Sequence, residues 1–368
     1  PMRIVQLANF HAPTSGGIRV ALEAIGAGYR RTGHDRVLIV PGRRRGRRDD
    51  LGGAVLQVPG VRLRGTPYRC IVDRRPLLSL LERLEPDVVE VSDKLTLRWV
   101  GGWARRAGVP SMLFSHERID AALAPHLPSV TPLGSIADRW NRHWADEFDS
   151  VVCCSRFAAQ EYARIGVEPT LVPLGVDLWR FRPRALTDSD GPTRLVVVAR
   201  LSPEKEVDRV IEAVRVLRSR GRSVRLDIAG SGPSERSLRR IASGLPVVFL
   251  GHLPGHDVAE LLAAAEVAIA PGPAETFGLA ALEALASGTP VVARDRGACR
   301  ELLTPEIGAT ASGDPARIAD AIEAVADRPR AETSAAARRH AERYDWSATV
   351  TGLLAVHEAG AGRVALTA

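Results

Sequence analysis

Short apolar runs alternate with amphipathic stretches through the first half of the chain. An apolar run at 3–7 is followed by a helical pattern from about Gly17 and by a second run at 36–40. This order predicts a βαβ unit, because β-branched runs favour strands and an amphipathic stretch between them can cover the sheet. Right-handed crossovers then predict a parallel sheet with helices on both faces. Further strands of this sheet are predicted at 87–91, 111–114 and 150–154.

The same pattern restarts after the loop at 177–193. An apolar run at 194–199 precedes a helix whose apolar residues recur at Val207, Val210, Ile211, Val214 and Leu217. Later strands, each leading into a turn that carries Gly or Pro, are predicted at 224–229, 246–250, 267–270 and 290–293. The second half is therefore predicted to be another doubly wound α/β sheet.

The length of 368 residues suits two domains of ordinary size. We expect an N-terminal Rossmann-like domain at 1–176 and a C-terminal one at 177–346. The chain ends in an amphipathic helix at 347–368, whose pattern alone would let it pack on either domain. The predicted fold class is α/β.

Composition indicates an ordinary soluble globular protein. Hydrophobic residues make up 45% and charged residues 25% of the chain. No apolar run approaches the roughly 20 residues of a membrane span, and the N-terminus leads directly into a strand instead of a signal peptide, so we expect a cytoplasmic protein. The four cysteines lack metal-site spacing and are expected to be reduced packing residues.

The net charge of +7 permits nucleic acid, anionic lipid or phosphorylated small molecules as partners. Charge alone does not choose among these three classes. Nearly all the positive charge is arginine, and Lys94 and Lys205 are the only lysines. This preference for arginine is interpreted as compositional bias and not as a nucleic-acid-binding surface.

The most specific motif is the pair Glu275 and Glu283, which are separated by seven residues and follow the predicted strand at 267–270. If a helix begins near Phe277, the backbone N–H groups of Phe277, Gly278 and Leu279 are free to bind a phosphate, which the helix dipole also favours. Glu275 would lie in the loop at the ligand, and Glu283 would accept a ribose hydroxyl. The alternative is an ordinary helix with two solvated glutamates.

A second motif, Arg200 to Lys205, follows the first strand of the second domain, where open α/β sheets bind ligands. Ser202 is a candidate N-cap and Pro203 a candidate first helical residue. Lys205 would then lie in the first helical turn, and with Arg200 it could bind a diphosphate. The alternative is a surface Arg–Lys pair.

Two glycine turns are weaker signals. Gly230 lies in a strand-to-helix turn that could bend tightly against a ligand, but the spacing is not that of a dinucleotide fingerprint. Gly16 and Gly17 open the first helix of the N-terminal domain and could approach a phosphate or sugar, or form an ordinary turn. His116 follows a predicted strand end, where a structural histidine is the default interpretation. The acidic pair at 188–190 is interpreted as solvated chain, and no metal site is predicted.

Together these motifs resemble the family-4 retaining glycosyltransferases of the GT-B fold, over nearly the whole chain. The resemblance implies two Rossmann-like domains facing a central cleft, with the last helix packing back toward the N-terminal domain. It implies that the element of Glu275 and Glu283 holds donor sugar and ribose, and that Arg200 and Lys205 neutralise the leaving diphosphate. His116 would contact the donor sugar.

The glycine loop of Gly16 and Gly17 matches that of the family, and the turn Gly251-His252-Leu253 is expected to contact the base. Around 16–19, 90–93 and 115–120 the chain is similar to actinobacterial mannosyltransferases that act on phosphatidylinositol or related glycolipids. This narrower resemblance implies GDP-mannose as donor. It also implies acceptor-binding roles for Asn9, Asp93 and Arg118. One departure is Glu206, where many relatives have glycine.

The predicted reaction is a metal-independent, front-face transfer of a hexose from a nucleotide sugar, with no further cofactor. Ile136, Trp140 and Trp144 at helical spacing, and the arginine run at 43–48, could contact an anionic membrane at its inner face. They could equally be core residues and a solvated loop. The alternatives are a UDP-sugar enzyme with a soluble acceptor and a non-catalytic nucleic-acid-binding protein. A phosphorylase is disfavoured because it needs a pyridoxal-binding lysine.

Overall fold

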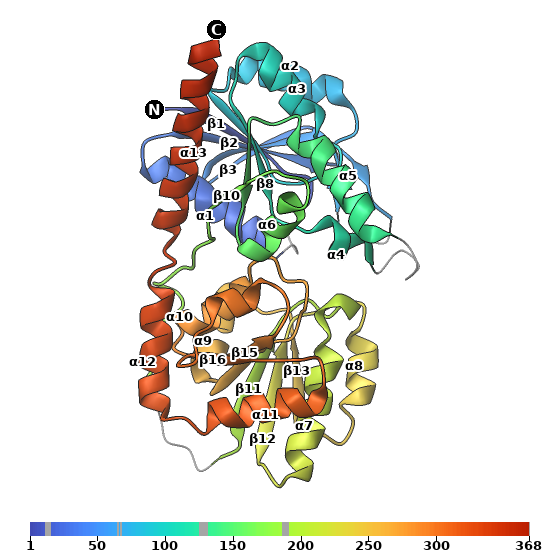
Figure 1. The fold of residues 1–368 in the computed structure, drawn as a ribbon, viewed down its shortest axis with the longest axis vertical. Helices are drawn as coiled ribbons and strands as arrows, with labels where there is room; N and C mark the ends of the chain where they lie inside the picture. The colour runs from blue at the N-terminus through green and yellow to red at the C-terminus, as the bar shows by residue number, and fades with distance from the viewer. Residues whose placement is uncertain (12–15, 65, 67, 125–131, 186–190, 368) are drawn as a thin grey trace. The chain divides into compact units, whose positions relative to one another are not determined.

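The computed structural model describes residues 1–11, 16–64, 66, 68–124, 132–185 and 191–367, which form two compact units (Figure 1). The N-terminal unit comprises Pro1–Gly175 together with Trp346–Ala368, and the C-terminal unit is Val176–Asp345. The unit boundary thus falls one residue before the position expected from sequence, and the last helix belongs to the N-terminal unit.

The N-terminal unit contains an eight-stranded sheet in the order β10-β9-β8-β7-β1-β2-β4-β3. All neighbours are parallel except the β3–β4 pair, which is antiparallel. The strands are β1 (Arg3–Leu7), β2 (Asp35–Gly42), β3 (Gly46–Asp50), β4 (Gly53–Pro59), β7 (Val88–Val91), β8 (Ser111–Ser115), β9 (Ser150–Cys153) and β10 (Thr170–Leu171). A separate pair consists of β5 (Val61–Arg62) and β6 (Arg69–Cys70).

Helices cover both faces of this sheet (Figure 1). They are α1 (Gly17–Arg31), α2 (Arg74–Leu84), α3 (Trp99–Ala107), α4 (Ile119–Leu123), α5 (Leu133–Ala145), α6 (Arg156–Ala163) and α13 (Trp346–Thr367). Buried side chains of β1, β7 and β8, such as Leu7, Val89 and Leu113, form the core with α2, α3 and α5. This burial supplies the main favourable term for folding of the unit.

The last helix α13 packs beside α1 (Figure 1). A Cβ atom at Gly28 of α1 would lie 2.3 Å from Cγ2 of Val350, so glycine permits this close approach. Beside this contact the buried carboxylate of Glu90 joins three elements. It accepts hydrogen bonds from the Tyr29 hydroxyl at 2.5 Å and from Gln6 Nε2 at 2.6 Å, and it lies 2.7 Å from His357 Nε2 of α13.

The C-terminal unit contains a six-stranded, fully parallel sheet in the order β13-β12-β11-β14-β15-β16. The strands are β11 (Thr193–Val198), β12 (Val224–Ala229), β13 (Val247–Gly251), β14 (Val267–Ala270), β15 (Val291–Arg294) and β16 (Gly308–Ala311). The covering elements are η2 (Pro203–Lys205), α7 (Val207–Ser219), α8 (Glu235–Ile241), α9 (Gly255–Ala264), α10 (Leu279–Ala286), η3 (Ala298–Leu302), α11 (Pro315–Ala326) and α12 (Arg330–Ala341). A core of Val, Leu and Ile between the sheet, α7 and α11 holds the unit together.

In each unit the strand order reverses once. Strands β11 to β13 follow one another in one direction and β14 to β16 in the other, so the reversal lies between β11 and β14. In the N-terminal unit the corresponding reversal lies between β1 and β7. Loops that leave the carboxyl ends of such a strand pair diverge to opposite faces of the sheet, and ligands bind at this point in open α/β sheets. Both units are therefore doubly wound, as expected from sequence.

The arginine run at 43–48 was expected to be a loop, but only its first part is one. From Gly46 onward it forms β3, an exposed edge strand paired with β4, and the Arg47 and Arg48 guanidinium groups lie 3.5 and 3.7 Å from carboxylates of Asp49 and Asp50. An exposed edge strand has no buried face, so the alternation that reveals strands was missing. The short, Gly- and Ala-rich β16 was missed for a related reason, because it carries few strand-forming residues.

All four cysteines are described; they are buried and form no disulfide, as predicted. The acidic pair at 188–190 lies outside the described residues. Among the residues that are described, no cluster of three or more His, Cys, Asp or Glu side chains could hold a metal ion. Within the same residues, every helix is too short or too polar to cross a membrane.

We expect Glu90→Ala to destabilise the N-terminal unit by about 3 kcal/mol, because removal of one partner leaves Tyr29, Gln6 and His357 without their buried acceptor. The free energy of unfolding in urea measures this change. Glu358→Ala, on the exposed side of α13, is the matched control and should change stability by less than about 0.5 kcal/mol. Equal effects of the two variants would contradict a role of Glu90 in docking α13.

Candidate functional site

The strand reversal of the C-terminal unit brings the two predicted motifs into contact. Lys205 ends the short helix η2 after β11, and Glu275 lies in the loop after β14. The Lys205 Nζ donates a hydrogen bond to Glu275 Oε1, and both side chains keep about a quarter of their surface exposed, at 23% and 28%. A cation and a carboxylate thus lie together at the edge where an α/β sheet binds its ligand.

Arg200 lies on the same loop but is paired locally. Its guanidinium lies 3.1 Å from Glu204, and the Ser202 hydroxyl donates to the same carboxylate at 2.5 Å. Burial would raise the pKa of Glu204, but the Ser202 hydrogen bond and the charges of Arg200 and Lys205 lower it. Glu204 is therefore ionised and holds the loop in shape.

The local structure of this loop differs from the sequence prediction. Pro203 to Lys205 form a separate 3-10 turn, and α7 begins only at Val207, after Glu206 in the left-handed region with φ of +48°. Ser202 makes no side-chain cap to the backbone; its hydroxyl is used by Glu204. Since Lys205 precedes the bend at Glu206, it belongs to the loop and not to the first turn of α7.

The helix of the glutamate motif begins two residues later than predicted. Gly278 has a φ of +96° and serves as N-cap, and α10 begins at Leu279. Leu279 and the next two residues therefore present the free N–H groups of the helix start. Phe277 instead buries its ring, which lies 6.3 Å from the ring of Tyr344. A Cβ at Gly278 would lie 2.4 Å from the Cys299 sulfur, so both the positive φ and the lack of space require glycine at this position.

Glu283 lies on α10, one turn beyond its start. Burial raises the pKa of this carboxyl to about 7, and the charge of Arg180 opposes the shift only in part. A half-buried carboxylate with little compensation inside the protein is ready to accept hydrogen bonds from a ligand.

The glycine turn at Gly230 packs against protein. Its φ is +138°, and a Cβ there would lie 1.8 Å from the Ala199 carbonyl oxygen. The next residues hold the same loop, because Leu201 N–H donates to Ser231 O at 3.0 Å and a Cβ at Gly232 would lie 2.3 Å from Leu201 O. Gly230 therefore supports the loop of Arg200 and Lys205 by backbone contact, and its direct contact with a nucleotide stays a prediction.

The turn expected to contact the base connects β13 with α9. Gly251 has a φ of +70°, and its carbonyl accepts a hydrogen bond from Gly230 N–H at 2.7 Å. His252 is exposed and Leu253 is half-buried. The turn is thus tied to the Gly230 loop at the same edge of the sheet.

The strand reversal of the N-terminal unit brings together Asn9, after β1, and Asp93, after β7. The Asp93 carboxylate accepts hydrogen bonds from Asn9 N–H at 2.8 Å and from Asn9 Nδ2 at 3.1 Å. Burial raises the pKa of Asp93, and the bonds from Asn9 oppose this. Because Asn9 is fully buried and Asp93 is 1% exposed, both side chains lock the two loops together. Their contact with an acceptor stays a prediction.

His116 follows β8, as expected, and its ring centroid lies 4.1 Å from that of Phe114. Burial lowers the pKa of His116 to about 4, and the charge of Glu90 opposes the shift. The imidazole is therefore neutral at pH 7 and can exchange hydrogen bonds with sugar hydroxyls without carrying charge.

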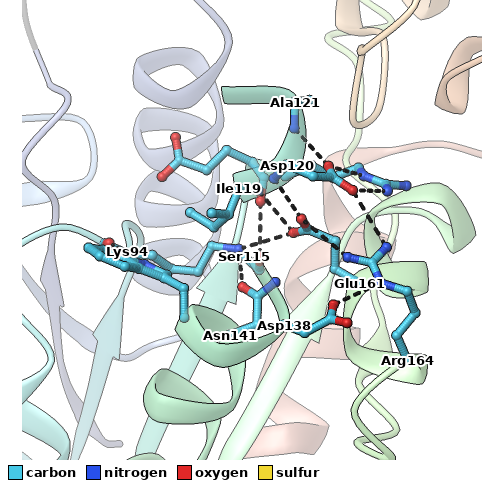
Figure 2. Close-up of polar contacts among 12 residues, drawn as sticks. Lys94, Ser115, Ile119, Asp120, Ala121, Asp138, Asn141, Glu161 and Arg164 are labelled. Atoms are coloured by element: carbon cyan, nitrogen blue, oxygen red, sulfur yellow. Dashed lines mark hydrogen bonds and ion pairs between the residues drawn. The ribbon is translucent and has the colours of Figure 1, made fainter. Parts of the chain in front are cut away.

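The loop after His116 rests on a buried network that the sequence analysis missed (Figure 2). Both oxygens of the buried Glu161 carboxylate cap the start of α4, accepting from Ile119 N–H at 3.0 Å and Asp120 N–H at 2.9 Å. The Lys94 ammonium donates to Asn141 Oδ1 at 2.9 Å and lies 3.6 Å from Glu161. The rarity of lysine was the available signal, since Lys94 is one of only two.

Arg118 is engaged within the same loop. It forms two hydrogen bonds to Asp120, at 3.0 and 2.6 Å, and its guanidinium lies 4.3 Å from the ring centroid of Phe157. Its Nη1 also donates hydrogen bonds to the Phe157 carbonyl at 3.0 Å and to Gln160 Oε1 at 3.1 Å, so its predicted role in acceptor binding would require an exchange of partners. Gly16 and Gly17 are exposed at the start of α1, and a Cβ at Gly16 would meet open space. Their predicted contact with the donor is thus permitted but not required by local packing.

We expect Glu283→Gln to stabilise the ligand-free C-terminal unit at pH 8 by about 1–3 kcal/mol and to have little effect at pH 5. The folded pKa of about 7 lies above the usual 4.5, so the native state loses stability as pH rises from 4.5 through 7 and the group ionises. Urea unfolding at several pH values measures this. Glu332→Gln, on an exposed position of α12, is the control, and a parallel pH profile for both variants would contradict the shift.

Two protein families match this chain, one over most of each unit. A family described as "Glycosyl transferase 4-like domain" matches residues 16–175, and one described as "Glycosyl transferases group 1" matches residues 192–328. The first match covers the N-terminal sheet apart from β1, and the second covers all six strands of the C-terminal sheet.

Curated relatives match over nearly the full length. A GDP-mannose-dependent alpha-(1-6)-phosphatidylinositol dimannoside mannosyltransferase of Mycobacterium tuberculosis is 43% identical over 365 residues, covering 96% of this chain and 95% of the relative. A GDP-mannose-dependent monoacylated alpha-(1-6)-phosphatidylinositol monomannoside mannosyltransferase of Corynebacterium glutamicum is 29% identical over 304 residues, covering 75% of this chain and 77% of the relative.

Solved structures share the fold at low sequence identity. A sucrose-phosphate synthase from Thermosynechococcus elongatus has a TM-score of 0.79 at 18% identity, covering 97% of this chain and 98% of that one. Anabaena HepE in complex with UDP has a TM-score of 0.74 at 18% identity, covering 96% and 98%. These likenesses confirm the predicted GT-B fold class. By its two family matches and its full-length relatives, the chain belongs to the family-4-type glycosyltransferases.

Proposed function

We propose that this enzyme is a retaining mannosyltransferase that moves mannose from GDP-mannose to a hydroxyl group of a phosphatidylinositol-type glycolipid. The names of the relatives from Mycobacterium tuberculosis and Corynebacterium glutamicum support both the donor and the acceptor class. The first of these relatives is 43% identical over almost the whole of both chains, which favours a shared substrate class.

The observation that carries the proposal is the contact between Lys205 and Glu275, a glutamate that precedes the start of α10 by four residues. A nucleotide diphosphate is a dianionic or trianionic leaving group, and its departure needs positive charge on the protein. Lys205, Arg200 and the helix start supply this charge in one place. We assign the diphosphate to these groups and a ribose hydroxyl to Glu283.

In the proposed reaction the bond between the anomeric carbon and the β-phosphate oxygen breaks as the acceptor oxygen bonds to that carbon from the same face. The acceptor proton passes to the leaving phosphate oxygen, so that no protein base is needed. Glu275 and the neutral His116 position the sugar through its hydroxyl groups. Retention follows because attack and departure use one face of the sugar.

The alternative donor is a UDP-sugar, with a soluble acceptor. The structure of Anabaena HepE in complex with UDP supports only the fold, because that protein is 18% identical to this chain. Gly251, His252 and Leu253, which we assign to the base, do not by themselves distinguish guanine from uracil. The donor is therefore the first property to measure.

We expect calorimetry to show micromolar binding of GDP and GDP-mannose and weaker binding of UDP and ADP analogues. Lys205→Ala should weaken GDP binding about 10-fold to 100-fold, because a charged hydrogen bond to phosphate is lost. Glu283→Ala should weaken both GDP and guanosine, because it removes a ribose contact. Arg317→Ala, at an exposed arginine of α11, is the control.

Absence of binding by every nucleotide would overturn the proposed function. In that case, salt-sensitive binding of nucleic acid would support the alternative of a basic, non-catalytic protein. Preference for UDP would retain the transferase and replace the donor.

A lipid acceptor requires the enzyme to reach a membrane, and we propose peripheral contact at the cytoplasmic face. Ile136, Trp140 and Trp144, which were predicted at helical spacing, differ in their exposure to solvent. Trp144 is buried in the core, whereas Ile136 and Trp140 of α5 are 37% and 39% exposed. Trp140 also donates its ring N–H to Lys94 O at 3.0 Å. The two exposed side chains and the arginines of 43–48 support contact with anionic lipid.

We expect the enzyme to co-sediment with vesicles of phosphatidylcholine and phosphatidylinositol at 0.1 M salt and to be largely released at 0.5 M salt. Ile136→Ser should reduce the bound fraction. Val248→Ser, with the same 37% exposure but on β13 of the C-terminal unit, should not. Equal binding to vesicles of phosphatidylcholine alone would overturn the electrostatic part of the proposal.

A further inference from the structure

Glu206 occupies a backbone conformation that favours glycine. Its φ of +48° makes it one of two non-glycine residues with positive φ among the described residues, the other being Glu85. A side chain in this region is disfavoured relative to glycine, because its Cβ comes too close to the following carbonyl oxygen. The bend comes directly after Lys205 and before α7, so the conformation at Glu206 sets the direction in which the Lys205 loop enters α7.

The Glu206 side chain has a specific partner. Its carboxylate accepts a hydrogen bond from Arg294 Nη1, and Arg294 is the last residue of β15. Arg294 is only 8% exposed, and its Nε has no hydrogen-bond partner within the described part of the chain. A Cβ at Gly313 would lie 2.7 to 2.9 Å from the guanidinium, so that group packs closely against Gly313. Arg294 is thus a buried cation with one carboxylate partner.

The Arg294–Glu206 pair is one of three ion pairs near the carboxyl edge of the C-terminal sheet. Arg200 is paired with Glu204, Lys205 with Glu275 and Arg294 with Glu206. Three cations therefore face three carboxylates on adjoining loops. Removal of Arg294 would leave the Glu206 carboxylate unpaired on the residue next to Lys205. A free carboxylate there would attract the Lys205 ammonium and repel a diphosphate.

We propose that Arg294 is a positioning residue that neutralises Glu206 and so keeps Lys205 available for the donor diphosphate. Arg294 acts through Glu206 and not by contact with the substrate. The inference rests on the proposed function, because it takes the diphosphate to bind at Lys205. It assigns a task to a buried arginine and explains how a glutamate is tolerated at a bend that suits glycine.

The test compares four proteins by calorimetric binding of GDP and of guanosine: the native enzyme, Arg294→Met, Glu206→Gln, and the double variant Glu206→Gln with Arg294→Met. Arg294→Met should weaken GDP binding about tenfold at 0.1 M salt, with a smaller loss at 0.5 M salt. Guanosine, which lacks the diphosphate, should bind as to the native enzyme. Glu206→Gln and the double variant should bind GDP within about twofold of the native enzyme.

Glu206→Gln keeps the inference testable if Arg294→Met fails to fold, which circular dichroism would show. A tenfold loss of GDP affinity in Glu206→Gln would mean that the pair acts only as a structural latch, and would overturn the proposed neutralisation. Unchanged GDP binding in a folded Arg294→Met would overturn it as well. Failure of the native enzyme to bind any nucleotide would instead overturn the proposed function, so the two failures are distinguishable.

Discussion

The reversal of strand order in each parallel sheet determines where chemistry can occur in this protein. Parallel strands all end at one edge, and at the reversal two neighbouring loops turn to opposite faces and leave backbone and side chains available between them. In the C-terminal unit this places Lys205 against Glu275, and in the N-terminal unit it places Asn9 against Asp93. The two pairs differ in burial. The first is partly exposed and can exchange its partner for a ligand, whereas the second is buried and locks its loops.

Much of this arrangement could be predicted from the sequence, because strong periodicity marks buried strands and helices. The strands near 3–7, 194–199 and 267–270 lie within one residue of their predicted positions. The edge strand β3 could not be predicted, since an exposed strand made of arginine and aspartate shows no alternation. The start of α10 was placed two residues early because the left-handed conformation of Gly278 has no signature beyond glycine itself.

Side-chain partners were harder to predict than positions. The sequence indicated that Gly230 allows a tight bend against a ligand, which stays a prediction, but it did not indicate that this turn also packs against Ala199 and Leu201. Likewise, nothing in the order of residues indicates that Glu161 caps a helix forty residues away, or that Lys94 pairs with it. Such contacts arise from packing between elements, and sequence spacing reports only the element on which a residue lies.

Under the proposed function, the paired charges of the C-terminal unit make donor binding an exchange of partners. Lys205 and Arg200 are each paired with a carboxylate, so under the proposed function a diphosphate competes with Glu275 and Glu204 for these cations and can displace them. The displaced carboxylate then needs another donor, and the hydroxyl groups of a bound sugar are suitable. A nucleoside diphosphate without its sugar leaves Glu275 without this compensation. Under the proposed function, the Lys205–Glu275 contact therefore favours the complete nucleotide sugar over its product.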